Sequence, residues 1–132
     1  MQQRPEAHLG NGRASFYSAR QHLEAAKIYL SENYCFEAMQ SASQAFVLLA
    51  KAMLSERQRR SDGYEEIVAG YANVIKQNGH PQPGRVDMLK KAIQFLQQQN
   101  KVPVSAQQAE LFIGAAEKIA EEIDSGSCKK RT

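Results

Sequence analysis

The chain has 132 residues, of which 42% are hydrophobic and 23% are charged, with a formal net charge of +3 and two cysteines. This length predicts one domain whose core is large enough to fold without disulfide or metal staples. The small net charge argues against a nucleic-acid-binding protein that relies on a broad basic face, and two cysteines exclude a disulfide-rich scaffold.

The N-terminal segment contains one proline and two glycines and has no hydrophobic periodicity. We therefore expect residues 1–14 to form a flexible arm. They lack the apolar run of a signal peptide, and no segment has the roughly 18 apolar residues of a membrane-spanning helix. The sequence predicts a cytoplasmic protein that does not contact a membrane.

Apolar residues recur at steps of three and four over residues 15–30, which predicts an amphipathic helix followed by a short polar turn. The next segment, residues 34–59, is predicted to be a helix that is apolar on nearly every side. Such a helix lies at the centre of a bundle or partly in a subunit interface. Its main stripe supplies the candidate dimer or core contacts, which are Met39, Ala42, Phe46, Leu49 and Met53.

A third helix is predicted to follow Asp62 and to end near Gln77, and the prolines and glycines of residues 78–84 predict a loop. A fourth helix is predicted over residues 85–99 and is broken at Pro103.

Ser105 and Gln108 have the spacing of a capping box, in which each side chain accepts a hydrogen bond from the other residue's backbone N–H. They predict a fifth helix that ends near Asp124. Residues 125–132 are polar and are predicted to form a flexible tail.

No segment shows the alternation of a strand, so the predicted fold class is all-α. Five helices joined by short loops favour antiparallel neighbours. We therefore predict an up-and-down antiparallel bundle of about five helices over residues 15–124, forming a single domain.

The first helical hairpin resembles the HEPN superfamily (higher eukaryotes and prokaryotes nucleotide-binding). The resemblance lies in a helix with an aliphatic end, a turn with an aromatic residue, and a second helix with closely spaced alanines that ends in the sequence AKAML at residues 50–54. The residues that carry it are Leu23, Ala26, Tyr29, Leu30, Tyr34, Glu37, Ala38, Ala42, Ala45, Phe46, Ala50, Lys51, Ala52 and Leu54.

The resemblance implies a compact bundle that pairs into a homodimer, and we predict no cofactor. It also implies a partner nucleotidyltransferase, a nucleotide or RNA as ligand, and a role in toxin–antitoxin or defence systems. Some members of the superfamily are metal-independent ribonucleases that use an arginine and a histidine with four to six residues between them.

The histidines of this chain do not reproduce that pattern. They are His8, His22 and His80, and none of them follows an arginine at the required spacing. The nearest pair is His80 with Arg85. The sequence therefore predicts a binding protein that is not an enzyme, with no catalytic residue. The alternative is a ribonuclease with atypical residues.

The strongest charged feature is the cluster of Arg57, Arg59 and Arg60. It either interacts with the carboxyl end of the second helix and packs along apolar surface, or contacts a phosphate of a nucleotide or RNA. No group of His, Cys, Asp or Glu residues has the spacing of metal ligands.

A second alternative for the function is a protein–protein interaction module of tetratricopeptide type, because the first helical hairpin also fits that repeat loosely.

Overall fold

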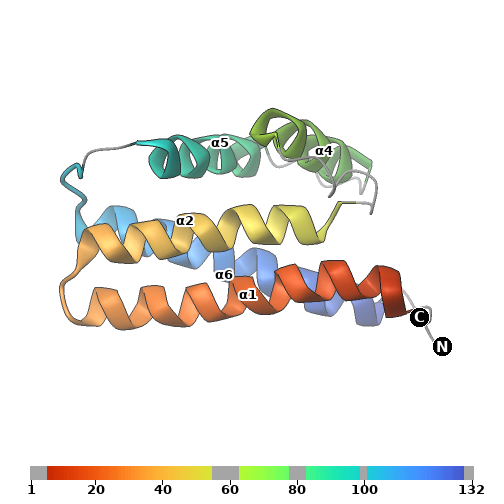
Figure 1. The fold of residues 1–132 in the computed structure, drawn as a ribbon, viewed down its shortest axis with the longest axis horizontal. Helices are drawn as coiled ribbons and strands as arrows, with labels where there is room; N and C mark the ends of the chain where they lie inside the picture. Colours follow the sequence, from red (N-terminus) through yellow and green to blue (C-terminus); the bar gives the residue numbers. More distant parts are fainter. Residues whose placement is uncertain (1–5, 55–62, 78–82, 99–100, 130–132) are drawn as a thin grey trace.

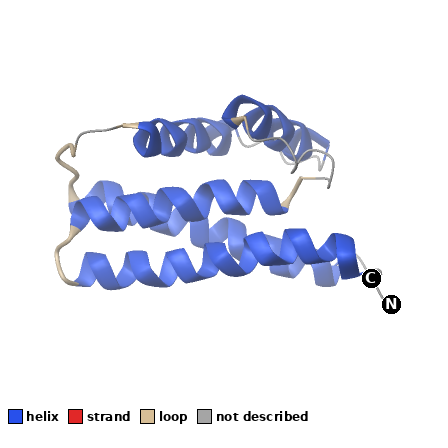
Figure 2. Cartoon of the chain, in the orientation of Figure 1, coloured by secondary structure: helices blue, strands red, loops and turns tan. Residues whose placement is uncertain are grey.

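A computed structural model describes residues 6–54, 63–77, 83–98 and 101–129. Within these ranges the chain is helical apart from a few turn and loop residues, so the predicted all-α class is confirmed (Figures 1 and 2). The helices are α1 (Glu6–Ser31), α2 (Cys35–Ala52), α4 (Tyr64–Gln77), α5 (Pro83–Gln97) and α6 (Ala106–Lys129).

The helices form two parts around α2. On one side α1, α2 and α6 pack together, with α1 and α2 forming an antiparallel hairpin. On the other side α4 and α5 follow one another along α2 and pack against it and against each other (Figure 1). We call α4 and α5 together the α4–α5 layer. Along the chain α1, α2, α5 and α6 alternate in direction, as expected for an up-and-down bundle.

The centre of the core is α2, because it packs against each of the other four helices. Met39, Ala42, Phe46 and Leu49 are buried, and Met53 packs against the core from its edge. The Phe46 ring contacts the Phe112 ring of α6, with 6.3 Å between the centroids. The predicted apolar stripe therefore lies inside the single chain.

The α1–α2 turn is a Schellman motif. The Tyr34 N–H donates to the Tyr29 carbonyl at 2.9 Å and the Asn33 N–H donates to the Leu30 carbonyl at 3.0 Å. Asn33 has a φ of 69°, in the left-handed region that asparagine tolerates better than other residues with a side chain. The Tyr29 and Tyr34 rings meet edge to face, which is the apolar contact that accompanies this motif.

The capping box at the start of α6 is confirmed. The Ser105 Oγ accepts a hydrogen bond from the Gln108 N–H at 3.1 Å, and the Gln108 Oε1 accepts one from the Ser105 N–H at 3.0 Å. These two bonds satisfy backbone donors that have no partner inside the helix. They fix the point at which the chain turns from the 101–105 connection into α6.

Two predicted flexible ends are helical instead. α1 begins at Glu6, not near Ser15, and α6 continues to Lys129, past the predicted end at Asp124. Adding a residue to an existing helix is far easier than starting one, so a well-packed helix continues into polar residues and across single glycines. Residues 6–14 and 125–129, which were predicted to lie in the flexible arm and the flexible tail, are therefore helical.

Two internal boundaries also differ. α2 ends at Ala52 and not near Arg59, because the Met53 and Leu54 N–H groups bond three residues back and the Leu54 side chain turns into the core. α5 begins at Pro83, where proline fits the first helical turn because it lacks an N–H that the helix would leave unpaired. No helix within the described ranges combines the length and hydropathy that a membrane-spanning segment needs.

Candidate functional site

The residues predicted to bind an anion, Arg57, Arg59 and Arg60, lie outside the described residues, as does His80. His22 lies on α1 and is partly exposed. Among the described side chains, no three His, Cys, Asp or Glu residues come together in a way that could hold a metal ion.

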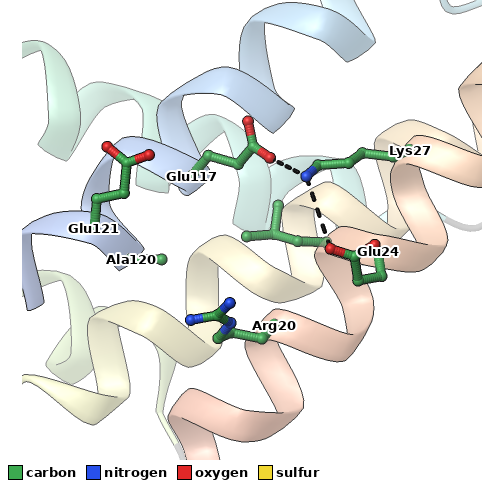
Figure 3. A pocket seen from close by; sticks show the side chains of 7 residues that line it. Arg20, Glu24, Lys27, Glu117, Ala120 and Glu121 are labelled. Atoms are coloured by element: carbon green, nitrogen blue, oxygen red, sulfur yellow. Dashed lines mark ion pairs between the residues drawn. The ribbon is translucent and has the colours of Figure 1, made fainter. Parts of the chain in front are cut away.

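A polar groove lies between α1 and α6 (Figure 3). Its volume is about 260 Å³, and its apolar base is formed by Leu23 and Ala120. The charged side chains along it come from both helices, and they are Arg20, Glu24, Lys27, Glu117 and Glu121. Sequence reasoning did not find this groove, because its two sides are almost a hundred residues apart in the chain.

One end of the groove is closed by ion pairs on Lys27. The Lys27 ammonium pairs with the Glu117 carboxylate of α6 and lies 3.7 Å from the Glu24 carboxylate of its own helix (Figure 3). The hydrogen bond with Glu117 raises the pKa of Lys27 above its usual value, so the ammonium stays charged at neutral pH. Lys27 therefore joins the two helices and is unsuited to act as a general base.

The outward face of α1, beside the groove, exposes two large apolar side chains. Tyr17 is 63% exposed and Ile28 is 61% exposed. They are separated by about three helical turns, so they lie on the same face, and Glu24 lies between them on that face. Two exposed apolar side chains on one helix face, with polar groups around them, offer a small surface for a protein–protein contact. We call Tyr17, Gln21, Glu24 and Ile28 the α1 outer face.

A second polar cluster joins the α4–α5 layer to α6. The Arg85 guanidinium donates two hydrogen bonds to the Glu122 carboxylate, one of them at 2.6 Å, and the Arg85 side chain is only 15% exposed. The pKa of Arg85 is raised chiefly by the bond to Glu122 and also by a hydrogen bond with Tyr71. Burial raises the pKa of Tyr71 to about 12. Arg85, the arginine closest to His80 in sequence, is thus paired with the Glu122 carboxylate.

Comparison of the chain with family models, with curated proteins and with solved structures gave no match.

Proposed function

We propose that this protein is a HEPN-like binding protein that pairs with a second copy of itself through the α1 outer face and has no catalytic role of its own. The exposed Tyr17 and Ile28 on one side of a rigid, well-packed helix carry the proposal. Helix α2 cannot provide the pairing surface through its main stripe, because Met39, Ala42, Phe46 and Leu49 are already buried within the chain.

The α1 outer face complements itself across a two-fold axis. When two α1 helices lie antiparallel and cross between Gln21 and Glu24, Tyr17 of each copy lies level with Ile28 of the other. The same arrangement brings Arg20 of one copy near Glu24 of the other. Apolar groups therefore meet apolar groups and a cation meets an acid, as a symmetric contact requires.

The HEPN resemblance supplies the proposed role, and that step rests on analogy. It points to a partner nucleotidyltransferase in a toxin–antitoxin or defence setting, with nucleotide or RNA binding through Arg57, Arg59 and Arg60 as the competing role. The bidentate pair of Arg85 with Glu122 supports a role without ribonuclease chemistry, because it occupies the arginine nearest His80.

Sedimentation equilibrium over a concentration series tests the pairing. A contact between two single helices is smaller than a standard interface, so we expect a reversible dimer that dissociates on dilution. Ile28→Glu is expected to give a monomer. Leu111→Glu is the matched control, because Leu111 is 62% exposed but lies on α6. A wild-type protein that stays monomeric throughout, or equal effects of the two variants, would refute the pairing.

The role is tested separately with purified wild-type protein. Stable co-elution with a nucleotidyltransferase from the same genomic neighbourhood supports the proposal. If the protein binds RNA, and the triple variant Arg57→Ala, Arg59→Ala, Arg60→Ala does not, the proposed protein partner is wrong and the ligand is a nucleic acid. RNA cleavage that persists in metal-free buffer would replace it with a ribonuclease.

A further inference from the structure

Ser43 is a fully buried residue near the middle of α2. Among the described residues, its Oγ is the buried side-chain polar atom that has no hydrogen-bond partner. A hydroxyl in this state has lost its water and gained nothing in return, so it destabilises the packed arrangement around it. Packing of another element over Ser43 is therefore opposed by the unsatisfied hydroxyl.

Helical spacing indicates which element covers Ser43. Ser43 follows Phe36 by about two helical turns, so both residues lie on the same side of α2. The Phe36 ring contacts the Phe95 ring of α5, with 5.2 Å between the centroids. Both α4 and α5 pack on α2 (Figure 1). The α4–α5 layer thus covers the side of α2 that carries Ser43.

Polar contacts lie near both ends of α5. In its first turn, Arg85 makes the bidentate pair with Glu122 of α6. In the connection to α6, four residues past the end of α5, the Lys101 ammonium lies 3.0 Å from the Glu37 carboxylate of α2 and 5.2 Å from the centroid of the Phe36 ring. Between these points α5 packs on α2 and α4, and the described parts of α5 and α6 have little direct packing.

We propose that the α4–α5 layer is a lid that opens away from α2 as one unit and is held closed by the Arg85–Glu122 ion pair of α5 and by the Lys101–Glu37 ion pair of the connection that follows it. The Tyr71 hydroxyl of α4 interacts with Arg85 of α5, so the two helices move together. Opening gives the Ser43 hydroxyl access to water and exposes the side of α2 that the layer covers. Helices α1, α2 and α6 stay packed during this opening.

Hydrogen exchange followed by mass spectrometry tests the lid, with the full chain in its native state. Glu122→Gln weakens the contact at the start of α5 and is expected to make the α4 and α5 amides exchange about tenfold faster. The α1 and α2 amides are expected to keep their wild-type rates. The matched control is Glu117→Gln, which makes the same change on α6 but affects the pair with Lys27 of α1.

Equal acceleration of all the helices in Glu122→Gln would overturn the proposal, because it would show that the layer opens only when the whole protein unfolds. Unchanged α4 and α5 rates would also overturn it, and so would a Glu117→Gln variant that accelerates α4 and α5 to the same degree.

A second variant tests the lid in the opposite direction. Ser43→Ala removes the unsatisfied hydroxyl with almost no change in shape, so the α4 and α5 amides are expected to exchange a few-fold more slowly. Ser41→Ala is the control, because Ser41 is also buried in α2 but lies on another side of the helix. Faster exchange in Ser43→Ala, or the same slowing in Ser41→Ala, would contradict the proposal.

Discussion

The two parts of the bundle are held together in different ways. The α1–α2–α6 part is closed by apolar packing, with the Phe46 and Phe112 rings in contact at its centre, and the Lys27–Glu117 ion pair joins α1 to α6 at its edge. The α4–α5 layer also buries apolar residues, but it packs against α2, which carries the unsatisfied Ser43 hydroxyl, and an ion pair lies near each end of α5. Ion pairs occur in both parts, so added salt should weaken contacts in each of them. We expect the two parts to respond differently to mutation and, through the buried Tyr71 of α4, to high pH.

The largest expected effect concerns the apolar part. Phe46→Ala removes a fully buried ring from the centre of α2 and should lower the free energy of unfolding by about 3–5 kcal/mol. Phe95→Ala, which removes a partly buried ring from the α4–α5 layer, should cost less. Urea denaturation measures both values. A Phe95→Ala loss that equals or exceeds the Phe46→Ala loss would contradict the difference between the two parts.

The second effect concerns pH and the α4–α5 layer. Burial raises the pKa of Tyr71 from its ordinary value of 10.0 to about 12, so the folded state favours the neutral phenol. The neutral phenol contributes fully to the free energy of unfolding below pH 10. As the pH rises from about 10 to 12, this contribution is lost, and the free energy of unfolding falls by on the order of 3 kcal/mol. In Tyr71→Phe this part of the loss should be absent. Denaturation curves of the two proteins over this pH range measure it, and parallel losses would refute the assignment to Tyr71.

The α1–α2 turn gives a smaller, local effect. Asn33→Ala places an ordinary side chain at a φ of 69° and should cost about 1 kcal/mol, while Asn33→Gly should match or exceed the wild type. Thermal unfolding of the three proteins measures the order. If alanine were as stable as glycine at this position, the left-handed conformation of residue 33 would be wrong.

The smallest predicted effect is at the start of α6. Ser105→Ala removes the acceptor for the Gln108 N–H and should cost about 1 kcal/mol or slightly less, whereas Ser105→Gly should cost only a few tenths. Because α6 packs against α1 and α2, the loss should appear in global unfolding. Exchange data that confine the effect of Ser105→Ala to α5 would contradict this arrangement.

Local sequence patterns predicted most of the fold. The steps of three and four gave the buried stripe of α1, the apolar character of α2 gave its central place, and the Ser105–Gln108 spacing gave the start of α6. These features depend on neighbours within a few residues. The start of α1 at Glu6 was missed because helix extension into polar residues leaves no periodic signal.

Most of the candidate site residues could not be predicted from the sequence, because their partners lie far away in the chain. Arg85 pairs with Glu122 across thirty-seven positions, and Lys27 pairs with Glu117 of a different helix. Nothing in the local pattern distinguishes these charges from solvated ones. The exposure of Ile28 could have been inferred, because it lies opposite the buried stripe of α1.

The difference between the two parts of the bundle is tested most directly by native-state hydrogen exchange of the wild-type protein at rising concentrations of denaturant. We predict that the α4 and α5 amides exchange through an opening of lower free energy than the α2 amides, which exchange only with global unfolding. A single opening free energy shared by α2, α4 and α5 would contradict the account.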